Sequence, residues 1–243
     1  MITRLFVSGN LFNGAKLKLD GDRAKYLGKV LRARVGNTFI IFDGSGLEWS
    51  AKITQITNNN IYFELGIGLD PHTESPLEIH LIQGISRGDR MDFVMQKATE
   101  LGIKSITPVL TDYGMVKLNS ERAQKRRDHW QKIANSACEQ SGRTRQPTID
   151  MPLSLEAYLN KPPIFDIKII LSPNASVPFT QIPAPKNKIC ILIGPEGGFS
   201  KHEYAHAKAI GFQEASLGPR ILRTESAAIS AISILQAKWG DLR

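Results

Sequence analysis

The stretch Ile189-Cys-Ile-Leu-Ile-Gly-Pro-Glu-Gly-Gly-Phe-Ser200 joins a short apolar run to a loop rich in glycine. Residues 189–193 are apolar and mostly β-branched, which is typical of a strand buried on both faces of a parallel sheet. Gly194, Gly197 and Gly198 carry no Cβ atom, so a ligand can approach the main-chain N–H and C=O groups of this loop. Taken alone, this loop is explained better as a tight turn from a strand into a helix than as a ligand-binding loop.

The chain after residue 77 alternates between strand-like and helix-like segments. Ser200 and Glu203 have the pattern of a capping box, which predicts that a helix begins there. Further strands are expected at residues 78–85, 106–110 and 167–171, and helices at residues 91–101, around residues 130–138 and at residues 226–239. This alternation predicts a parallel α/β sheet whose ligands bind at the carboxyl ends of the strands.

Three loops of similar composition are expected at strand ends, at residues 172–176, 194–200 and 218–225. Each contains Pro and small residues where the backbone must turn sharply. One such loop is most simply a turn, but three on successive strand ends predict a composite pocket.

Several classes of enzyme are excluded by missing motifs. The chain has no Gly-x-x-x-x-Gly-Lys-[Ser/Thr], the phosphate-binding loop of nucleoside triphosphatases, and no Gly-x-Gly-x-x-Gly, the usual dinucleotide site. It also has no Gly-x-Ser-x-Gly, the nucleophile elbow of serine hydrolases. The histidines lack the spacing of a metal-ligand set, so no metal site is expected. Cys138 and Cys190 are far apart and without a Cys-x-x-Cys motif, which favours a reducing compartment.

The first part of the chain shows a different pattern of expected secondary structure. Short alternating strands around residues 38–42, 49–53 and 61–65, with one helix at residues 22–34, predict a small β-barrel. Residues 66–76 are rich in Gly and Pro and carry no periodicity. We therefore expect a first domain at residues 1–70, a linker at 71–77 and a second domain at 78–243.

The charge balance favours a polyanionic partner. The 243 residues include 31 basic and 23 acidic side chains, a net charge of +8. Residues 117–145 carry a local positive excess, which fits a surface that follows phosphates and equally fits a solvated helix face. No apolar run approaches the roughly 18 residues of a membrane span, and the first 12 residues lack the apolar core of a secretion signal.

The loop at residues 194–200 and the stretch Leu217-Gly-Pro-Arg-Ile-Leu-Arg-Thr-Glu-Ser-Ala227 resemble the signature loops of the SPOUT methyltransferases. Within that superfamily the chain resembles the ribosomal RNA small subunit methyltransferase E family, from its start to Trp239. Supporting stretches are Phe42-Asp-Gly44, Ser86-Arg-Gly88, Gln96-Lys97, Glu100-Leu-Gly102 and Ala137-Cys-Glu-Gln-Ser-Gly-Arg143. Ser226 departs from the family, in which Thr is frequent, but both side chains carry a hydroxyl.

The resemblance implies an N-terminal PUA-like RNA-binding β-barrel followed by a SPOUT-type parallel-sheet domain with a trefoil knot. It implies a cytoplasmic homodimer without a metal, using S-adenosylmethionine (SAM) to methylate N3 of a uridine in 16S ribosomal RNA. A catalytically silent RNA-binding or ribosome-assembly protein on the same scaffold is the alternative. A methyltransferase acting on another RNA atom, such as ribose O2′ or guanine N1, is a third reading.

The loops supply the expected cofactor contacts. Adenine offers one amino donor and several ring acceptors, which main-chain groups at strand ends can match without polar side chains. The predicted cofactor-binding residues are Leu171, Ser172, Pro173, Ile193, Gly194, Pro195, Glu196, Gly197, Leu217, Gly218, Ile221, Leu222, Arg223, Thr224 and Ala227.

The charged loop residues are the candidates for catalysis. Negative charge develops on the uracil carbonyls as N3 loses its proton, and a guanidinium stabilises that charge. We assign this role to Arg223, with Arg220 second. Glu196 and Glu225 either accept the proton, orient Arg223 or face the sulfonium of SAM. Alternatively, these arginines and glutamates pair with one another and only hold the loops together.

Basic side chains are expected to bind the RNA backbone, giving affinity but little sequence choice. The predicted RNA-binding residues are Arg4, Arg23, Lys29, Arg32, Arg34, Arg87 and Arg143. The basic helix at residues 122–132 is a candidate second contact.

Overall fold

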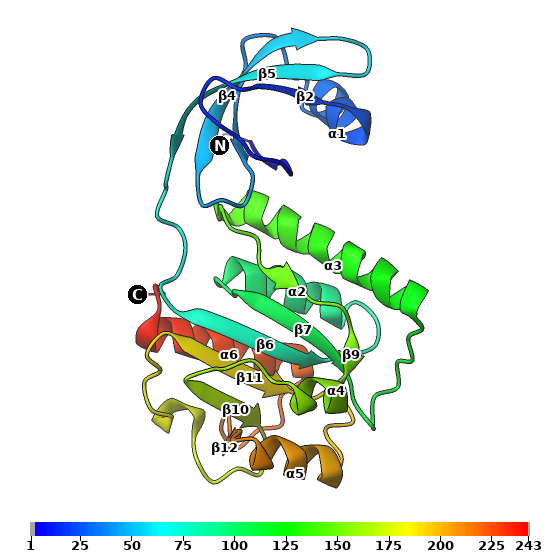
Figure 1. Cartoon of the computed structure of the whole chain (residues 1–243), viewed down its shortest axis with the longest axis vertical. Helices are drawn as coiled ribbons and strands as arrows, with labels where there is room; N and C mark the ends of the chain where they lie inside the picture. Colours follow the sequence, from blue (N-terminus) through cyan, green and yellow to red (C-terminus); the bar gives the residue numbers. More distant parts are fainter. Residues whose placement is uncertain (1–2, 243) are drawn as a thin grey trace. The chain divides into compact units, whose positions relative to one another are not determined.

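The computed structural model describes residues 3–242, which form two compact units (Figure 1). The first unit runs to Glu74 and also takes in Cys138–Arg145; the second comprises Ser75–Ala137 and the chain from Gln146 onward. The helix α3 (Ser120–Ser141) is therefore divided between the units. The sequence patterns gave no signal that residues 138–145 would join the first unit.

The first unit is built on a five-stranded sheet of order β1-β3-β4-β5-β2. Its strands are β1 (Arg4–Phe6), β2 (Lys16–Leu19), β3 (Thr38–Phe42), β4 (Glu48–Ile56) and β5 (Ile61–Leu69). β1 pairs with β3 in parallel, and the other pairs are antiparallel. The predicted inward alternation is confirmed, because Trp49, Ala51, Ile53 and residues 61, 63 and 65 are all buried.

The helix predicted at residues 22–34 is confirmed as far as Val30 and is wrong for residues 31–34. The helix α1 (Gly21–Lys25) passes into a π-helical turn, η1 (Tyr26–Val30), in which Leu31 N–H donates to Tyr26 C=O. The wider π-turn carries later side chains off the packed face, so Leu27 is buried while Val30 is 64% exposed. Arg32 then adopts a left-handed φ of 51°, which ends the helix.

The second unit contains a parallel sheet of order β12-β10-β11-β6-β7-β8, with β9 also pairing with β7. Its strands are β6 (Glu78–Gly84), β7 (Ser105–Leu110), β8 (Thr148–Ile149), β9 (Leu153–Ser154), β10 (Ile167–Leu171), β11 (Lys188–Ile193) and β12 (Gln213–Ala215). The four predicted strands, β6, β7, β10 and β11, are confirmed. The other three are too short for their residues to show a period.

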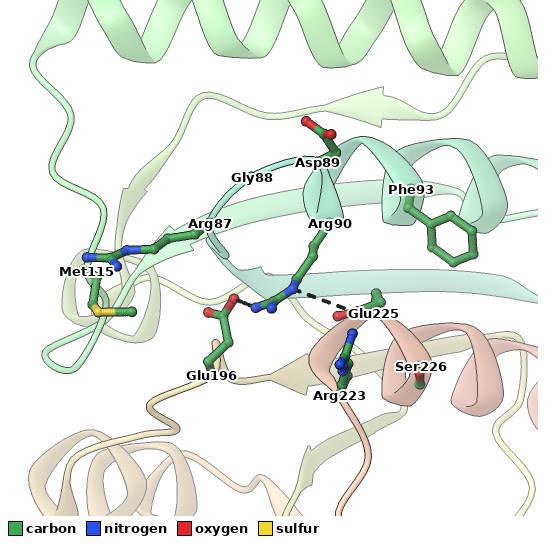
Figure 2. Close-up of a pocket in the computed structure, with 10 residues that line it drawn as sticks. All are labelled: Arg87, Gly88, Asp89, Arg90, Phe93, Met115, Glu196, Arg223, Glu225 and Ser226. Carbon is green, nitrogen blue, oxygen red and sulfur yellow. Dashed lines mark hydrogen bonds and ion pairs between the residues drawn. The ribbon is translucent and has the colours of Figure 1, made fainter.

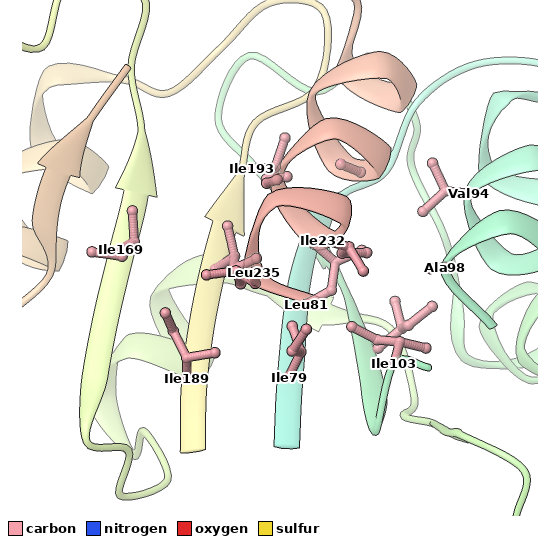
Figure 3. Packing of buried hydrophobic residues seen from close by; sticks show 14 of the residues in the cluster. Ile79, Leu81, Val94, Ala98, Ile103, Ile169, Ile189, Ile193, Ile232 and Leu235 are labelled. Carbon is pink, nitrogen blue, oxygen red and sulfur yellow. The ribbon is translucent and has the colours of Figure 1, made fainter. Parts of the chain in front are cut away.

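Helices cover both faces of this sheet. They are α2 (Arg90–Glu100), α3, α4 (Leu155–Asn160), η2 (Phe179–Gln181), α5 (Lys201–Ala209) and α6 (Thr224–Trp239). Alternate residues of β11 enter different clusters: Ile191 packs in the core that includes α2, α3 and α6, and Leu192 in the core that includes α4 and α5. Figure 3 shows the first of these cores, with Ile79, Ile189 and Leu235 among its members. Burial on both faces explains why β11 is continuously apolar from Ile189 to Ile193.

The connection from β12 to α6 runs from one edge of the sheet back to its centre. β12 lies at one edge beside β10, yet the helix that follows returns to the centre of the sheet. There the Thr224 hydroxyl donates to Gly194 C=O at 2.7 Å and accepts from the Gln83 amide at 2.8 Å. Such a return across neighbouring loops is the connection that a trefoil knot requires. The same bonds start α6 at Thr224, two residues earlier than predicted.

Candidate active site

The three predicted loops meet in space. β12, β10 and β11 are neighbours in the sheet, and the loops at their carboxyl ends surround a cavity of about 590 Å³. Of the predicted cofactor-binding residues, those that line this cavity are Leu171, Ser172, Pro173, Ile193, Gly194, Pro195, Glu196, Leu217, Gly218, Ile221, Leu222, Arg223, Thr224 and Ala227. The parallel order of the strands thus brings together segments about 50 residues apart in sequence.

Gly197 is the exception among these residues, because it does not line the cavity. A Cβ atom there would lie 2.8 Å from Tyr113 C=O, so the glycine is required by packing against the loop after β7. Gly198 lines the cavity instead and has a left-handed φ of 69°. The pattern Gly-Gly could not indicate which glycine faces the ligand and which faces the protein.

The loop after β11 is held from the helix that follows it. The capping box is confirmed: Glu203 N–H donates to the Ser200 hydroxyl, and Ser200 N–H donates to the Glu203 carboxylate. The Ser200 hydroxyl also donates to Asp112 at 2.5 Å, and Asp112 N–H donates to Glu203 at 2.9 Å. These bonds fix the end of the cavity loop to the loop after β7.

A second cavity, of about 930 Å³, adjoins the first (Figure 2). Its lining residues are Arg87, Gly88, Asp89, Arg90, Phe93, Met115, Glu196, Arg223, Glu225 and Ser226. Arg90, Glu196 and Arg223 belong to the lining of both cavities. Glu225, predicted as catalytic, lies only in the second.

Arg90, which the sequence analysis did not select, organises the charges between the two cavities. Its guanidinium donates to Glu196, and its Nε lies 4.0 Å from a carboxylate oxygen of Glu225. Arg220 and Arg223, in the third loop, do not pair with these carboxylates. Their side chains have no hydrogen-bond or ion-pair partner among residues 3–242. The alternative that the loop arginines and glutamates pair with each other is therefore wrong.

Other cavity residues were also missed. Phe199 and Tyr204 line the first cavity, and Phe93 and Met115 the second. Burial raises the pKa of Tyr204 to about 12, so its hydroxyl is protonated at neutral pH and can donate a hydrogen bond. The sequence offered only indirect signals that two of the missed residues lie near the site. Tyr204 follows Ser200 by one helical turn, and Arg90 follows the stretch Ser86-Arg-Gly88.

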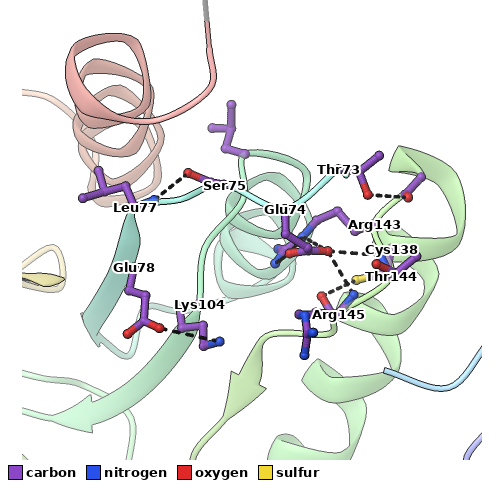
Figure 4. A network of polar contacts seen from close by, with 12 residues as sticks. Thr73, Glu74, Ser75, Leu77, Glu78, Lys104, Cys138, Arg143, Thr144 and Arg145 are labelled. Atoms are coloured by element: carbon purple, nitrogen blue, oxygen red, sulfur yellow. Dashed lines mark hydrogen bonds and ion pairs between the residues drawn. The ribbon is translucent and has the colours of Figure 1, made fainter. Parts of the chain in front are cut away.

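The predicted RNA-binding residues fall into two groups. Lys29, Arg32, Arg34 and Arg87 are exposed, as a phosphate contact requires. Arg143 is a correction: its side chain is only 6% exposed and is bound to Glu74 (Figure 4). A guanidinium held in this way cannot contact RNA, and burial could not be read from the sequence.

Arg4 and Arg23 also have partners within the first unit. Arg4 pairs with Glu48 and donates to the main chain of residues 142 and 143, and its side chain is 15% exposed. Arg23 pairs with Glu139, although 43% of its side chain stays exposed. Arg4 is therefore better explained as a structural residue than as an RNA contact.

Residues 3–242 contain neither a metal-ligand cluster nor a membrane-spanning helix. No group of three or more His, Cys, Asp and Glu side chains in this part of the chain is arranged to hold a metal ion. None of its helices is both long enough and apolar enough to cross a membrane.

The chain matches known proteins over its full length. The family model described as RNA methyltransferase domain matches residues 73–236 of this chain. The family model described as RNA methyltransferase PUA domain matches residues 19–66. Ribosomal RNA small subunit methyltransferase E of Buchnera aphidicola (Schizaphis graminum) is 35% identical, over 99% of this chain and 98% of its own. The chain belongs to the ribosomal RNA small subunit methyltransferase E family. The Bacillus subtilis member is 28% identical, over 93% of this chain and 91% of its own.

Solved structures of similar proteins agree with the fold. The Neisseria gonorrhoeae ribosomal RNA small subunit methyltransferase E, bound to SAM, is 38% identical with a TM-score of 0.93, and the match covers 100% of both chains. A Legionella pneumophila methyltransferase in complex with SAM gives 38% identity and a TM-score of 0.94, again over 100% of both chains. The predicted fold class, a SPOUT-type α/β domain after a PUA-like module, is confirmed.

Proposed function

We propose that this protein transfers the methyl group of SAM to N3 of a uridine in 16S ribosomal RNA. The observation that carries the proposal is the convergence of three strand-end loops on one cavity that opens onto a second, arginine-lined cavity. A cavity of about 590 Å³ with apolar walls and main-chain polar groups is of the size that small cofactors occupy. The two similar proteins solved with SAM support the choice of cofactor.

The residues present fit this cofactor. Leu171, Ile193, Leu217, Ile221 and Leu222 provide apolar walls, and the main chain of the loops provides donors and acceptors for adenine. Gly194 lets the loop pack closely on itself, because a Cβ atom there would lie 3.2 Å from both the Phe199 ring and Gly198 Cα. The bound cofactor would supply an electrophilic methyl group on a sulfonium.

The charged residues between the cavities fit the substrate chemistry. Arg223 is free to face the negative charge that develops on the uracil carbonyls. We assign the acceptance of the N3 proton to Glu225, because its side chain is 15% exposed, compared with 30% for Glu196. The proton passes from N3 to this carboxylate, N3 forms the new bond to the methyl carbon, and the carbon–sulfur bond breaks.

The first unit fits a role in holding the RNA. Lys29, Arg32 and Arg34 are exposed on the π-turn and the segment after it, and we propose that they contact phosphates. On the family resemblance we further propose a homodimer that acts in the cytoplasm, where it meets ribosomal RNA.

The proposal is tested by incubating the purified protein with isotopically labelled SAM and unmodified RNA. Small ribosomal subunits and deproteinised 16S RNA are both supplied, and the nucleosides are then analysed by mass spectrometry. Label in 3-methyluridine is the expected result. Label in a ribose-methylated nucleoside or in 1-methylguanosine would assign another atom, and failure to bind SAM in calorimetry would support a silent RNA-binding protein.

A further inference from the structure

The second cavity contains a large aromatic side chain that the proposed chemistry does not use. In α2, Met91, Val94, Met95 and Ala98 are buried in the core, whereas Phe93 faces the cavity and is 45% exposed. Phe93 lies three residues after Arg90, so the two side chains occupy the same side of the helix. An exposed phenylalanine on a helix that already buries a full apolar face contributes little to folding.

Three arginines, Arg87, Arg90 and Arg223, line the same cavity as this ring. Figure 2 shows Arg90 between Phe93 on one side and Arg87 with Met115 on the other. The side chain of Arg87 has no hydrogen-bond or ion-pair partner within residues 3–242. An exposed aromatic ring and an unpaired guanidinium in one cavity are the groups that bind single-stranded nucleic acid, since a base stacks on the ring and a phosphate pairs with the arginine.

We propose that Phe93 is the platform on which the target uracil stacks after it leaves the RNA structure, and that Arg87 binds the phosphate beside it. This inference rests on the proposed function and adds the residues that receive the substrate. A base must leave its stack before an enzyme can reach N3, and a protein ring replaces the stacking that the base loses. The two cavities share Arg90, Glu196 and Arg223, so a base on Phe93 borders the cofactor cavity.

The first test separates stacking from ordinary apolar contact. Phe93→Ala and Phe93→Leu are expected to lower kcat/KM for RNA by about 5- to 150-fold, the range for loss of one base–aromatic stack. Phe93→Tyr retains the ring and is expected to stay within about threefold of the unchanged protein. SAM affinity, measured by calorimetry, is expected to be the same in all variants. Ile164→Ala is the control, because Ile164 is 93% exposed and lines neither cavity.

Two outcomes of this test overturn the proposal. If Phe93→Leu is as active as the unchanged protein, an apolar contact suffices and no base stacks there. If Phe93→Ala instead changes the sedimentation coefficient of the protein, the ring belongs to a contact between two copies of the chain.

A binding measurement keeps the inference separate from the proposed function. Phe93→Trp is titrated with a short uridine oligonucleotide, and its fluorescence quenching is compared with that of the unchanged protein. The three tryptophans of the unchanged protein, Trp49, Trp130 and Trp239, line neither cavity. Added quenching in the variant is expected even if no methyl transfer is found, and its absence overturns the stacking role. Arg87→Ala is expected to lower the salt dependence of RNA binding by about one unit of slope, and an unchanged slope would remove the phosphate contact.

Discussion

At the scale of single residues, the charge arrangement around Arg90 determines which groups are free to act. One guanidinium holds Glu196 and approaches Glu225, and Arg223 is left without a partner beside them. Two carboxylates near two arginines would otherwise be free to pair in several ways. Arg90 is therefore a positioning residue that keeps Arg223 available to the substrate.

Arg223→Ala is expected to lower kcat by about 100-fold, because removing one group that stabilises the transition-state charge typically costs that much. SAM affinity is expected to change far less, since the cavity walls remain. Single-turnover methyl transfer and calorimetry measure the two effects separately. Unchanged turnover on RNA would show that the electrostatic role is wrong.

Arg90→Ala is expected to reduce kcat by about 10-fold or more, because Glu196 and Glu225 become free to capture Arg223. The distinguishing readout is a double variant: adding Glu196→Gln to Arg90→Ala removes one competing charge and should restore part of the lost activity. A residue that only stabilised the fold would give no such recovery. Melting temperatures of the variants provide the control for folding.

At the scale of elements, two loops after neighbouring strands are fitted closely to each other. A Cβ atom on Gly84, the last residue of β6, would lie 2.4 Å from the Pro195 ring in the loop after β11. Such a contact cannot be relieved by a side-chain rotation, because it involves the proline ring and backbone atoms. The end of β6 therefore sets the position of the cofactor loop.

Gly84→Ala is expected to weaken SAM binding at least about 10-fold and to destabilise the protein by about 1–3 kcal/mol, the usual cost of overpacking. Calorimetry and chemical denaturation measure these effects. Gly28→Ala is the matched control, because a Cβ atom at Gly28 meets nothing within 4 Å. Equal SAM affinity in the Gly84→Ala variant would mean that the loop position does not matter for binding.

Some of these elements could be predicted from the sequence and others could not. β10 and β11 are short segments of mostly apolar, β-branched residues, so their positions and the convergence of their loops were predicted. The π-turn after Lys25 has no distinct composition and was missed. Arg90 was missed because its partners, Glu196 and Glu225, lie more than 100 residues away in the sequence. Spacing patterns report local structure and carry no information on such tertiary pairs.

At the scale of the whole molecule, a segment from the middle of the chain completes the first unit. The Glu74 carboxylate accepts from the Arg143 guanidinium at 2.7 Å and from the main-chain N–H groups of Thr144 and Arg145 (Figure 4). All of these residues belong to the first unit. The buried Arg143 thus anchors residues 138–145 to Glu74. Its charge had led to the prediction that it binds RNA.

Glu74→Ala is expected to destabilise the protein by about 3–5 kcal/mol, because it leaves the buried Arg143 guanidinium without its carboxylate. Chemical denaturation measures this change. Glu64→Ala, at an exposed residue of β5, is the control and should have little effect. A loss below about 1 kcal/mol for Glu74→Ala would mean that the network does not hold the segment.

The central claim is that the loops after β10, β11 and β12 together bind one methyl donor, largely through their main chain. A crystal structure of this protein with SAM tests it most directly. The account predicts adenosyl density within the cavity lined by Leu171, Gly194 and Leu217, with hydrogen bonds from main-chain atoms of these loops. Density at any other place, or contacts to only one of the three loops, would contradict it.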